Sequence, residues 1–199
     1  MKKIALCGPS GVGKGYVSQA IISFYGFPVL DTDLTVHDMY ENDKDLISEL
    51  SCIFGNDIVK DGKIHRPTLR NIVFSNRAAL DTLNHTVHQR VKFKTMDWFN
   101  EMEKAGYKAA FVDIPQIIES GMADEFDLVI GVTAPREVRI QRIVQRDKIS
   151  LADAEKRINN QLSDKEYKAV CHYTIVNDGG NIIDALDGIF KEVELIEKT

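Results

Sequence analysis

Gly8-Pro9-Ser10-Gly11-Val12-Gly13-Lys14 lies between a short apolar run, residues 3–7, and a stretch with apolar residues at helical spacing, residues 16–25. A strand, a glycine-rich loop and a helix in this order are the context of a phosphate-binding loop, or P-loop. Its glycines let successive backbone N–H groups and the helix N-terminus face one anion, and Lys14 would reach the β and γ phosphates of a nucleotide. The alternative is a glycine-rich turn that only precedes a helix.

The residue after the P-loop lysine departs from the usual pattern. Ser or Thr normally offers a hydroxyl to Mg²⁺ at this position, whereas this chain has Gly15. A water molecule would take the place of that hydroxyl, because Mg²⁺ in such sites is held mainly by phosphates and one or two carboxylates. Ser18 lies one turn further along the helix, too far to be assumed as a substitute.

Four further apolar runs are too short for helices and are bounded by turn or charged residues. Helical patterns separate most of them from one another, which favours a parallel sheet. Together with residues 3–7 they predict an α/β fold with about five parallel strands. The runs are residues 28–30, 111–112, 128–132 and 173–176.

The stretch between the second and third runs has a different pattern. Residues 34–106 contain no convincing strand and carry apolar residues at helical spacing. We expect a helical insertion that caps the C-terminal edge of the sheet, where it can form a substrate pocket. A second helical piece, residues 150–161, opens with Ser150 and with Asp153 three residues later, a capping-box-like start. Apolar spacing over 182–196 predicts one amphipathic helix capped by Asn181.

Composition excludes several classes of protein. The 25 basic and 30 acidic residues give a formal charge of -5, so a generally basic nucleic-acid surface is not expected. The longest apolar stretch, 20–30, is interrupted by polar residues, glycine and proline and is far shorter than the roughly 20 residues of a membrane span. The chain enters its glycine-rich segment without the apolar core of a signal peptide. We therefore expect a cytoplasmic protein that binds neither nucleic acid nor membrane.

The cysteines and histidines do not indicate a metal or disulfide framework. Cys7, Cys52 and Cys171 are odd in number, widely spaced and without a Cys-x-x-Cys pair, so we expect three reduced thiols. His85 and His88 have a helical i, i+3 spacing, but no His-Glu-x-x-His pattern accompanies them.

Two groups of carboxylates follow predicted strands. Asp31 and Asp33 close the second run, near the expected phosphates, where a carboxylate can orient an acceptor hydroxyl and take its proton. Asp33 could instead be the N-cap of the next helix. Asp113, at the end of a buried strand, has the position of a Walker-B-like carboxylate that holds Mg²⁺ directly or through water. Its alternative role is a turn-forming residue before Pro115.

Four arginines at spacings of three or four would line one face of the helix after the fourth strand. They are Arg136, Arg139, Arg142 and Arg146. A solvated helix face is one interpretation. Because the next helical piece looks like a closing lid, these arginines are also placed to neutralise charge that develops on a transferred phosphoryl group.

The assembled residues resemble those of the dephospho-CoA kinase family, over nearly the whole chain. Many kinases share the P-loop, but the block from Asp113-Ile114-Pro115 to Glu119-Ser120-Gly121 and the Arg, Gln and Asn-x-Gly series together are fairly specific. The matching blocks are the P-loop, 31–33, 64–69 with 73–74, 83–88, 113–121, Arg142, 145–147, Gln161 and 175–179.

This resemblance implies an ATP-dependent kinase that phosphorylates the ribose 3′-hydroxyl of dephospho-CoA to give CoA and ADP, the last step of coenzyme A biosynthesis. ATP and dephospho-CoA would be its partners and Mg²⁺ its cofactor. The resemblance also implies one domain, residues 1–199, with a P-loop NTPase-type three-layer core (1–33, 107–139 and 166–199). A helical substrate-binding insertion (34–106) and a small helical lid (140–165) would complete it.

The resemblance also implies roles for single residues. Lys14, Asp33 and Arg142 would be catalytic, as phosphate ligand, proposed base and lid arginine. Asp113 would hold Mg²⁺. The acceptor would be bound by Asp33, Arg66, His88 and Glu119. The ATP and its phosphates would be bound by Gly8, Ser10, Gly11, Val12, Gly13, Lys14, Gly15, Tyr16, Arg142, Arg146 and, near the adenine, Asn177.

Four positions depart from the family pattern. The family usually has Ser or Thr at Gly15, Asp at His65, Pro at Gln89 and Leu at Gln116, and the last three lie on or near the implied acceptor pocket. Two alternatives therefore stay open. One is a P-loop kinase for another nucleoside or small hydroxyl acceptor, and the other is a degenerate relative that binds ATP or CoA without full activity. The sequence does not specify an oligomeric state.

Overall fold

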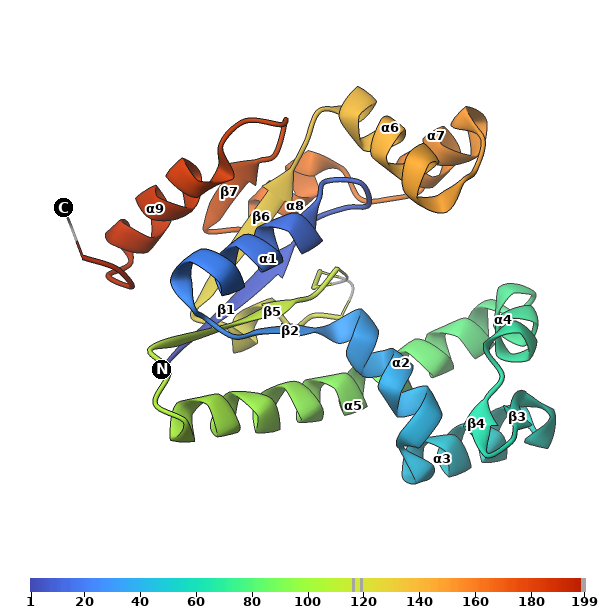
Figure 1. The fold of residues 1–199 in the computed structure, drawn as a ribbon. Coiled ribbons are helices and arrows are strands. Elements are labelled where there is room, and N and C mark those ends of the chain that lie inside the picture. Colours follow the sequence, from blue (N-terminus) through green and yellow to red (C-terminus); the bar gives the residue numbers. More distant parts are fainter. Residues whose placement is uncertain (116, 119, 198–199) are drawn as a thin grey trace. The chain divides into compact units, whose positions relative to one another are not determined.

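The computed structural model describes residues 1–115, 117–118 and 120–197 (Figure 1). The chain divides into two compact units. One unit comprises Met1–Leu30 and Phe99–Thr199, and the other comprises Asp31–Trp98. The expected boundaries of core, insertion and lid stay a prediction. Helices α6 and α7, which lie largely in the expected lid, belong to the first unit.

A five-stranded sheet forms the centre of the first unit, in the order β2-β5-β1-β6-β7 (Figure 1). Strand β1 pairs in parallel with β5 and β6, and β6 pairs in parallel with β7. The predicted α/β fold with about five parallel strands is therefore confirmed. The strands are β1 (Lys2–Cys7), β2 (Val29–Asp31), β5 (Ala109–Asp113), β6 (Leu128–Thr133) and β7 (Tyr173–Val176).

Both faces of this sheet are covered. Alternate residues of β1, β5 and β6 pack against α1 (Lys14–Tyr25) and α9 (Ile182–Glu192), while α8 (Asp164–Val170) contacts β6 on the opposite face. Strands buried on two faces need apolar side chains at successive positions, so their sequences are continuous apolar runs. This is why short runs without alternation identified the strands.

Helix α1 begins at Lys14, directly after the P-loop, and ends at Gly26, whose left-handed φ of 68° stops the helix. Helix α6 (Arg136–Asp147) packs on α7 (Leu151–Asn159) through a small apolar cluster that includes Ile143 and Ile158. The predicted cap of α7 is confirmed, because the Ser150 side chain accepts a hydrogen bond from the Asp153 backbone N–H.

The second unit is mainly helical and has its own apolar core, which includes Met39, Leu50, Leu69 and Val87. Its elements are α2 (Thr32–Asn42), α3 (Lys44–Phe54), η1 (Asn56–Ile58), β3 (Val59–Lys60), β4 (Lys63–Ile64) and α4 (Arg66–Phe74). Helix α5 (Arg77–Lys104) begins in this unit and ends in the first.

The expectation that residues 34–106 contain no strand is wrong. Strands β3 and β4 form a small antiparallel hairpin. Its two-residue turn, Asp61-Gly62, has φ values of 52° and 76°, and Asp-Gly is a typical sequence for such a turn. The strands are only two residues long, so they carry no apolar pattern that would predict them. The Asp61-Gly62 dipeptide was the sequence feature that could have indicated the hairpin.

Two features near the C-terminus differ from what the sequence indicated. The final helix α9 ends at Glu192 rather than near 196, because Glu194 adopts a left-handed φ of 60° and Leu195 N–H returns to the Phe190 carbonyl. Helix α8 was not predicted, although Ser163 and Glu166 form a complete capping box at its start.

No helix in the described part of the chain is both long enough and apolar enough to cross a membrane.

The cap of α9 supports a stability prediction. Asn181 accepts a hydrogen bond from the Ile183 N–H, and α9 carries Leu186 and Phe190 into the main core. Asn181→Ala should destabilise the protein by about 1 kcal/mol, which lowers Tm by about 2–4 °C. Asn181→Ser, which retains an acceptor oxygen, should lie close to wild type in the same thermal melt. Equal losses in both variants would contradict the capping role.

Candidate active site

The P-loop glycines are required by close backbone approach. Gly11 has a φ of 83°, and a Cβ at this position would lie 2.7 Å from the Arg139 carbonyl oxygen. Gly13 has a φ of 85°, and its Cβ would collide with the side-chain amide of Asn177. A side chain at either position would have to displace α6 or the segment after β7, so both contacts depend on glycine.

Lys14 lies across the P-loop. Its Nζ donates a hydrogen bond to the Gly8 carbonyl oxygen over 2.9 Å, which connects the end of the loop to its beginning. A phosphate bound in the loop would offer oxygen acceptors with more negative charge. The Lys14 ammonium group can then leave the Gly8 carbonyl oxygen and donate to the phosphate.

Arg142 on α6 holds the outer side of the loop. Its Nη1 donates to the carbonyl oxygens of Gly11 (3.4 Å) and Val12 (3.2 Å). Nη1 also donates to the Asn177 carbonyl oxygen at 3.0 Å. In a planar trans peptide, the carbonyl and the next N–H point in opposite directions. The N–H groups of Val12 and Gly13 therefore point away from Arg142, toward the side where a phosphate binds such a loop.

Asn177 follows β7 and is 3% exposed. Its Nδ2 donates to the Val12 carbonyl oxygen over 2.8 Å, and its backbone N–H donates to the Thr133 carbonyl oxygen over 2.8 Å. The side chain thus links the P-loop to the last strand of the sheet.

A pocket of about 390 Å³ opens beside these residues. It brings together four residues expected to bind ATP from three separate parts of the chain. The lining residues are Gly13, Tyr16, Arg142, Asn177, Gly179 and Gly180.

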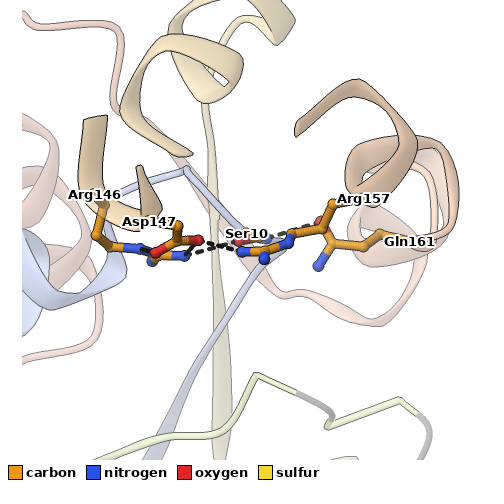
Figure 2. Close-up of polar contacts among 5 residues, drawn as sticks. All are labelled: Ser10, Arg146, Asp147, Arg157 and Gln161. Atoms are coloured by element: carbon orange, nitrogen blue, oxygen red, sulfur yellow. Dashed lines mark hydrogen bonds and ion pairs between the residues drawn. The ribbon is translucent and has the colours of Figure 1, made fainter. Parts of the chain in front are cut away.

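Two residues outside the expected ATP-binding and acceptor-binding sets also hold the loop. Arg139 is buried, its Nε donates to the Ser10 carbonyl oxygen over 3.0 Å, and its Nη2 donates to Gln161 Oε1 over 3.2 Å. Gln161 Oε1 also accepts the Ser10 backbone N–H over 3.0 Å, and Figure 2 shows Gln161 beside Ser10. Arg139 belonged to the predicted arginine stripe and Gln161 to the blocks of the family resemblance, but neither pattern indicates which backbone atoms they contact.

Arg146 lies at the edge of this network (Figure 2). It donates to both carboxylate oxygens of Asp147, at 2.7 and 3.1 Å, and reaches Ser10 Oγ at 3.4 Å. Arg157 of α7 makes a further ion pair with Asp147. The group therefore connects α6, α7 and the P-loop.

The hydrogen bonds of Arg146, followed by those of Arg157, lower the pKa of Asp147 from 3.8 to about 2. For a carboxyl whose pKa is lowered by folding, the stabilisation is complete above the unfolded pKa and is lost as the pH falls through the folded value. The ion pairs of Asp147 should thus be intact at neutral pH and weaken only between about pH 4 and pH 2.

Asp113 ends β5 and is 8% exposed. Its register partner in β1 is Leu6, two residues before the P-loop, so the carboxylate lies at the same edge of the sheet. The described residues contain no group of three or more His, Cys, Asp or Glu side chains able to hold a metal ion. One hard carboxylate at this edge fits a magnesium ion whose other ligands are phosphate oxygens and water.

Gly15 lies in the first turn of α1 and is exposed. No atom lies within 4 Å of the position of a Cβ on this residue, and its φ is not in the left-handed region. Backbone geometry and packing therefore do not require glycine here.

The second unit carries three further residues expected at the site. Asp31, not Asp33, is the N-cap of α2, because its Oδ1 accepts the N–H groups of Asp33 and Leu34. The alternative that Asp33 is only a helix cap is therefore wrong. Asp33 lies in the first turn of α2.

Arg66 begins α4, and His88 lies within α5. Burial raises the pKa of Tyr40, and the nearby positive charge of Arg66 opposes this rise. The remaining expected acceptor residue, Glu119, lies outside the described residues, as does the departing position Gln116.

A glycine-rich loop at the end of a central parallel strand, with its lysine and several arginines around it, defines a P-loop phosphotransferase. The family model of the dephospho-CoA kinases matches residues 2–182. The chain belongs to the dephospho-CoA kinase family.

Individual relatives agree with this assignment. A dephospho-CoA kinase of Fusobacterium nucleatum is 35% identical over 193 residues, which cover 96% of this chain and 94% of the relative. A crystal structure from Thermus thermophilus superposes with a TM-score of 0.80 at 27% identity, covering 96% of this chain and 97% of that one. Dephospho-CoA kinase from Campylobacter jejuni gives a TM-score of 0.70 at 26% identity, with coverages of 96% and 98%.

The contacts of α6 lead to a prediction. Arg139→Gln removes the hydrogen bonds of a buried cation to the Ser10 carbonyl oxygen and to Gln161, each worth about 1.5–3 kcal/mol, and should lower both Tm and ATP affinity, the latter about tenfold or more. Arg136→Gln is the matched control, because Arg136 lies on the same helix and is exposed, and its guanidinium donates to Asn159. Calorimetric titration with ATP should separate the two variants. Equal ATP affinities would show that Arg139 does not shape the loop.

Proposed function

We propose that this protein transfers the γ-phosphoryl group of ATP to the ribose 3′-hydroxyl of dephospho-CoA and releases CoA and ADP. The observation that carries the proposal is the P-loop with its carbonyl oxygens held by α6, in a chain that matches the dephospho-CoA kinase family over residues 2–182. The pocket beside Gly13, Arg142 and Asn177 is the place proposed for the adenine end of the nucleotide.

The P-loop would bind the phosphates through backbone N–H groups between Gly8 and Gly15 and through Lys14. Arg142 and Arg146 add positive charge beside the loop. Phosphoryl transfer spreads negative charge over the transferred group, and fixed cations and N–H dipoles stabilise that charge more strongly than water does. Lys14 would leave the Gly8 carbonyl oxygen as it binds phosphate.

Asp33 is the proposed base. Its carboxylate would accept the proton of the acceptor hydroxyl as the oxygen attacks phosphorus. Arg66, His88 and Glu119 would bind the remainder of dephospho-CoA. Two of the departing positions have local partners, since His65 Nδ1 lies 2.7 Å from Thr68 Oγ1 and Gln89 Nε2 lies 2.8 Å from His85 Nε2. The contacts of His65 and Gln89 therefore do not favour an acceptor other than dephospho-CoA.

A kinase of this family that uses ATP generally needs a divalent metal ion, and we propose Mg²⁺. Asp113 would be its carboxylate ligand. When bound, the ion would neutralise charge on the β and γ phosphate oxygens. A water molecule would be the Mg²⁺ ligand in place of the hydroxyl that Gly15 lacks.

A cytoplasmic location and the absence of nucleic-acid partners belong to the same proposal. They rest on the balance of 25 basic and 30 acidic residues and on three free cysteines, which suit a reducing compartment.

The direct test is mass spectrometry of the products formed from ATP, Mg²⁺ and dephospho-CoA. CoA should appear with the wild-type protein and be absent with Lys14→Ala, which controls for contaminating kinases. A competing panel of nucleosides and other hydroxyl acceptors should give less product than dephospho-CoA. A better acceptor in that panel, or ATP binding without any product, would overturn the proposal.

The assignment of the base leads to a prediction. Asp33→Asn should lower kcat by about 10²–10⁴-fold while ATP affinity stays nearly unchanged, because a positioned proton acceptor acts only on the chemical step. Asp38→Asn, in the same helix and also exposed, is the matched control and should retain activity. Unchanged turnover in Asp33→Asn would remove Asp33 from the mechanism.

Gly15 allows a second prediction. The free space around its Cβ position means that Gly15→Ser and Gly15→Ala should both fold, with a gain of about 0.5 kcal/mol from helix propensity. If a missing hydroxyl limits metal binding, only Gly15→Ser should reduce the Mg²⁺ concentration needed for half-maximal turnover, by about tenfold. The comparison of serine with alanine isolates the hydroxyl. The same Mg²⁺ dependence in all three proteins would show that water replaces it without loss.

A further inference from the structure

Two cysteines that are far apart in the sequence meet beside the P-loop. The Sγ atoms of Cys7 and Cys171 lie 3.4 Å apart, although 164 positions separate them in the chain. Cys7 is the last residue of β1 and directly precedes Gly8, whereas Cys171 lies between α8 and β7. A disulfide S–S bond is about 2.05 Å long, so the two sulfur atoms would have to approach by about 1.4 Å.

Gly131 explains how the thiols can meet. Strand β6 lies between β1 and β7, so the two cysteines come from chain segments that are roughly 10 Å apart across the sheet. Gly131 of β6 is the register partner of Cys7, and a Cβ on Gly131 would lie 2.6 Å from Cys171 Sγ. The missing side chain leaves the space above β6 in which the two sulfur atoms meet.

Backbone contacts hold both cysteines in place. Cys7 lies within the pairing of β1 with β6. Cys171 N–H donates to the Tyr167 carbonyl oxygen, and the next residue, His172, exchanges hydrogen bonds with Val129 of β6 through its backbone N–H and its Nδ1. The short sulfur–sulfur distance is therefore fixed by the sheet and not by a mobile loop.

The two thiols have different chemical surroundings. Cys7 is buried, whereas Cys171 is partly exposed. The hydrogen bond to Cys171, together with burial, raises the pKa of the Cys7 thiol. The same hydrogen bond lowers the pKa of the Cys171 thiol. Cys171 is thus the more accessible and more readily ionised sulfur, and Cys7 is the neighbour able to react with it afterwards.

We propose that Cys7 and Cys171 are an oxidation site, at which hydrogen peroxide forms a reversible disulfide next to the P-loop. Cys171 thiolate attacks one peroxide oxygen, the O–O bond breaks, and after protonation a sulfenic acid and one water result. The Cys7 sulfur then attacks the sulfenic sulfur, displaces hydroxide and loses its proton, giving the disulfide and a second water. Two thiols lose two electrons, and one peroxide molecule gains them.

The disulfide should reduce ATP binding and turnover. Cys7 is bonded to Gly8, whose carbonyl oxygen accepts the hydrogen bond of Lys14 Nζ. Movement of Cys7 toward Cys171 would be passed to the start of the P-loop, and displacement of a positioning group by about 1 Å can cost on the order of 10²-fold in rate. This effect on turnover rests on the proposed function, whereas formation of the disulfide does not.

The test begins with the reduced protein, treated with increasing hydrogen peroxide and then with a thiol-blocking reagent. Peptide mass spectrometry without reductant should reveal a Cys7–Cys171 linked pair, lighter by two hydrogen atoms than the separate peptides. ATP affinity and turnover should fall by about tenfold or more in parallel with this pair, and dithiothreitol should restore all three.

Matched variants make the result specific. Cys52→Ser removes the exposed cysteine of the second unit and should leave both the linked pair and the loss of turnover unchanged. Cys171→Ser should abolish the linked pair and the dithiothreitol-reversible loss. Oxidation that modifies Cys52 or Cys171 without linking Cys7 would overturn the proposal, as would a linked pair that leaves ATP affinity unaltered. Absence of CoA formation in the reduced wild type would refute the proposed function alone, because the linked pair is detected independently.

Discussion

Three consecutive carbonyl oxygens of the P-loop, those of Ser10, Gly11 and Val12, are held by arginines of α6. Each contact turns a carbonyl outward, so the N–H of the following residue turns inward. A loop with its dipoles fixed in this way needs little rearrangement when an anion binds, which is the condition under which such dipoles stabilise charge most strongly. The rest of the site depends on this orientation.

The arginines of α6 make two different kinds of contact. Arg139 is buried against Ser10, and Arg142 contacts Gly11 and Val12, so the interpretation of the stripe as a solvated face is wrong for these two residues. Arg136 is exposed and donates to Asn159 of α7. A chain with a net charge of -5 can therefore build a local anion site. A few arginines hold the loop carbonyl oxygens, and the loop N–H groups are left to face the anion.

Sequence patterns predicted the features that local physics determines. The P-loop, the five strands, and the caps at Ser150 and Asn181 each depend on neighbouring residues, and the structure confirms them. The contacts of Arg139 and Gln161 with Ser10 join segments distant in sequence, so spacing within one helix did not reveal them. The contact between Cys7 and Cys171 depends on Gly131 in a third strand and likewise has no local signal.

A crystal structure with dephospho-CoA and a non-hydrolysable ATP analogue would test the central claim most directly. In that complex, the carbonyl oxygens of Ser10, Gly11 and Val12 should stay on the α6 arginines while the phosphates bind the opposite side of the loop. Lys14 Nζ should leave the Gly8 carbonyl for the phosphates, and the ribose 3′-oxygen should lie within hydrogen-bond distance of Asp33. Phosphates bound elsewhere, or carbonyl oxygens turned toward the nucleotide, would contradict it.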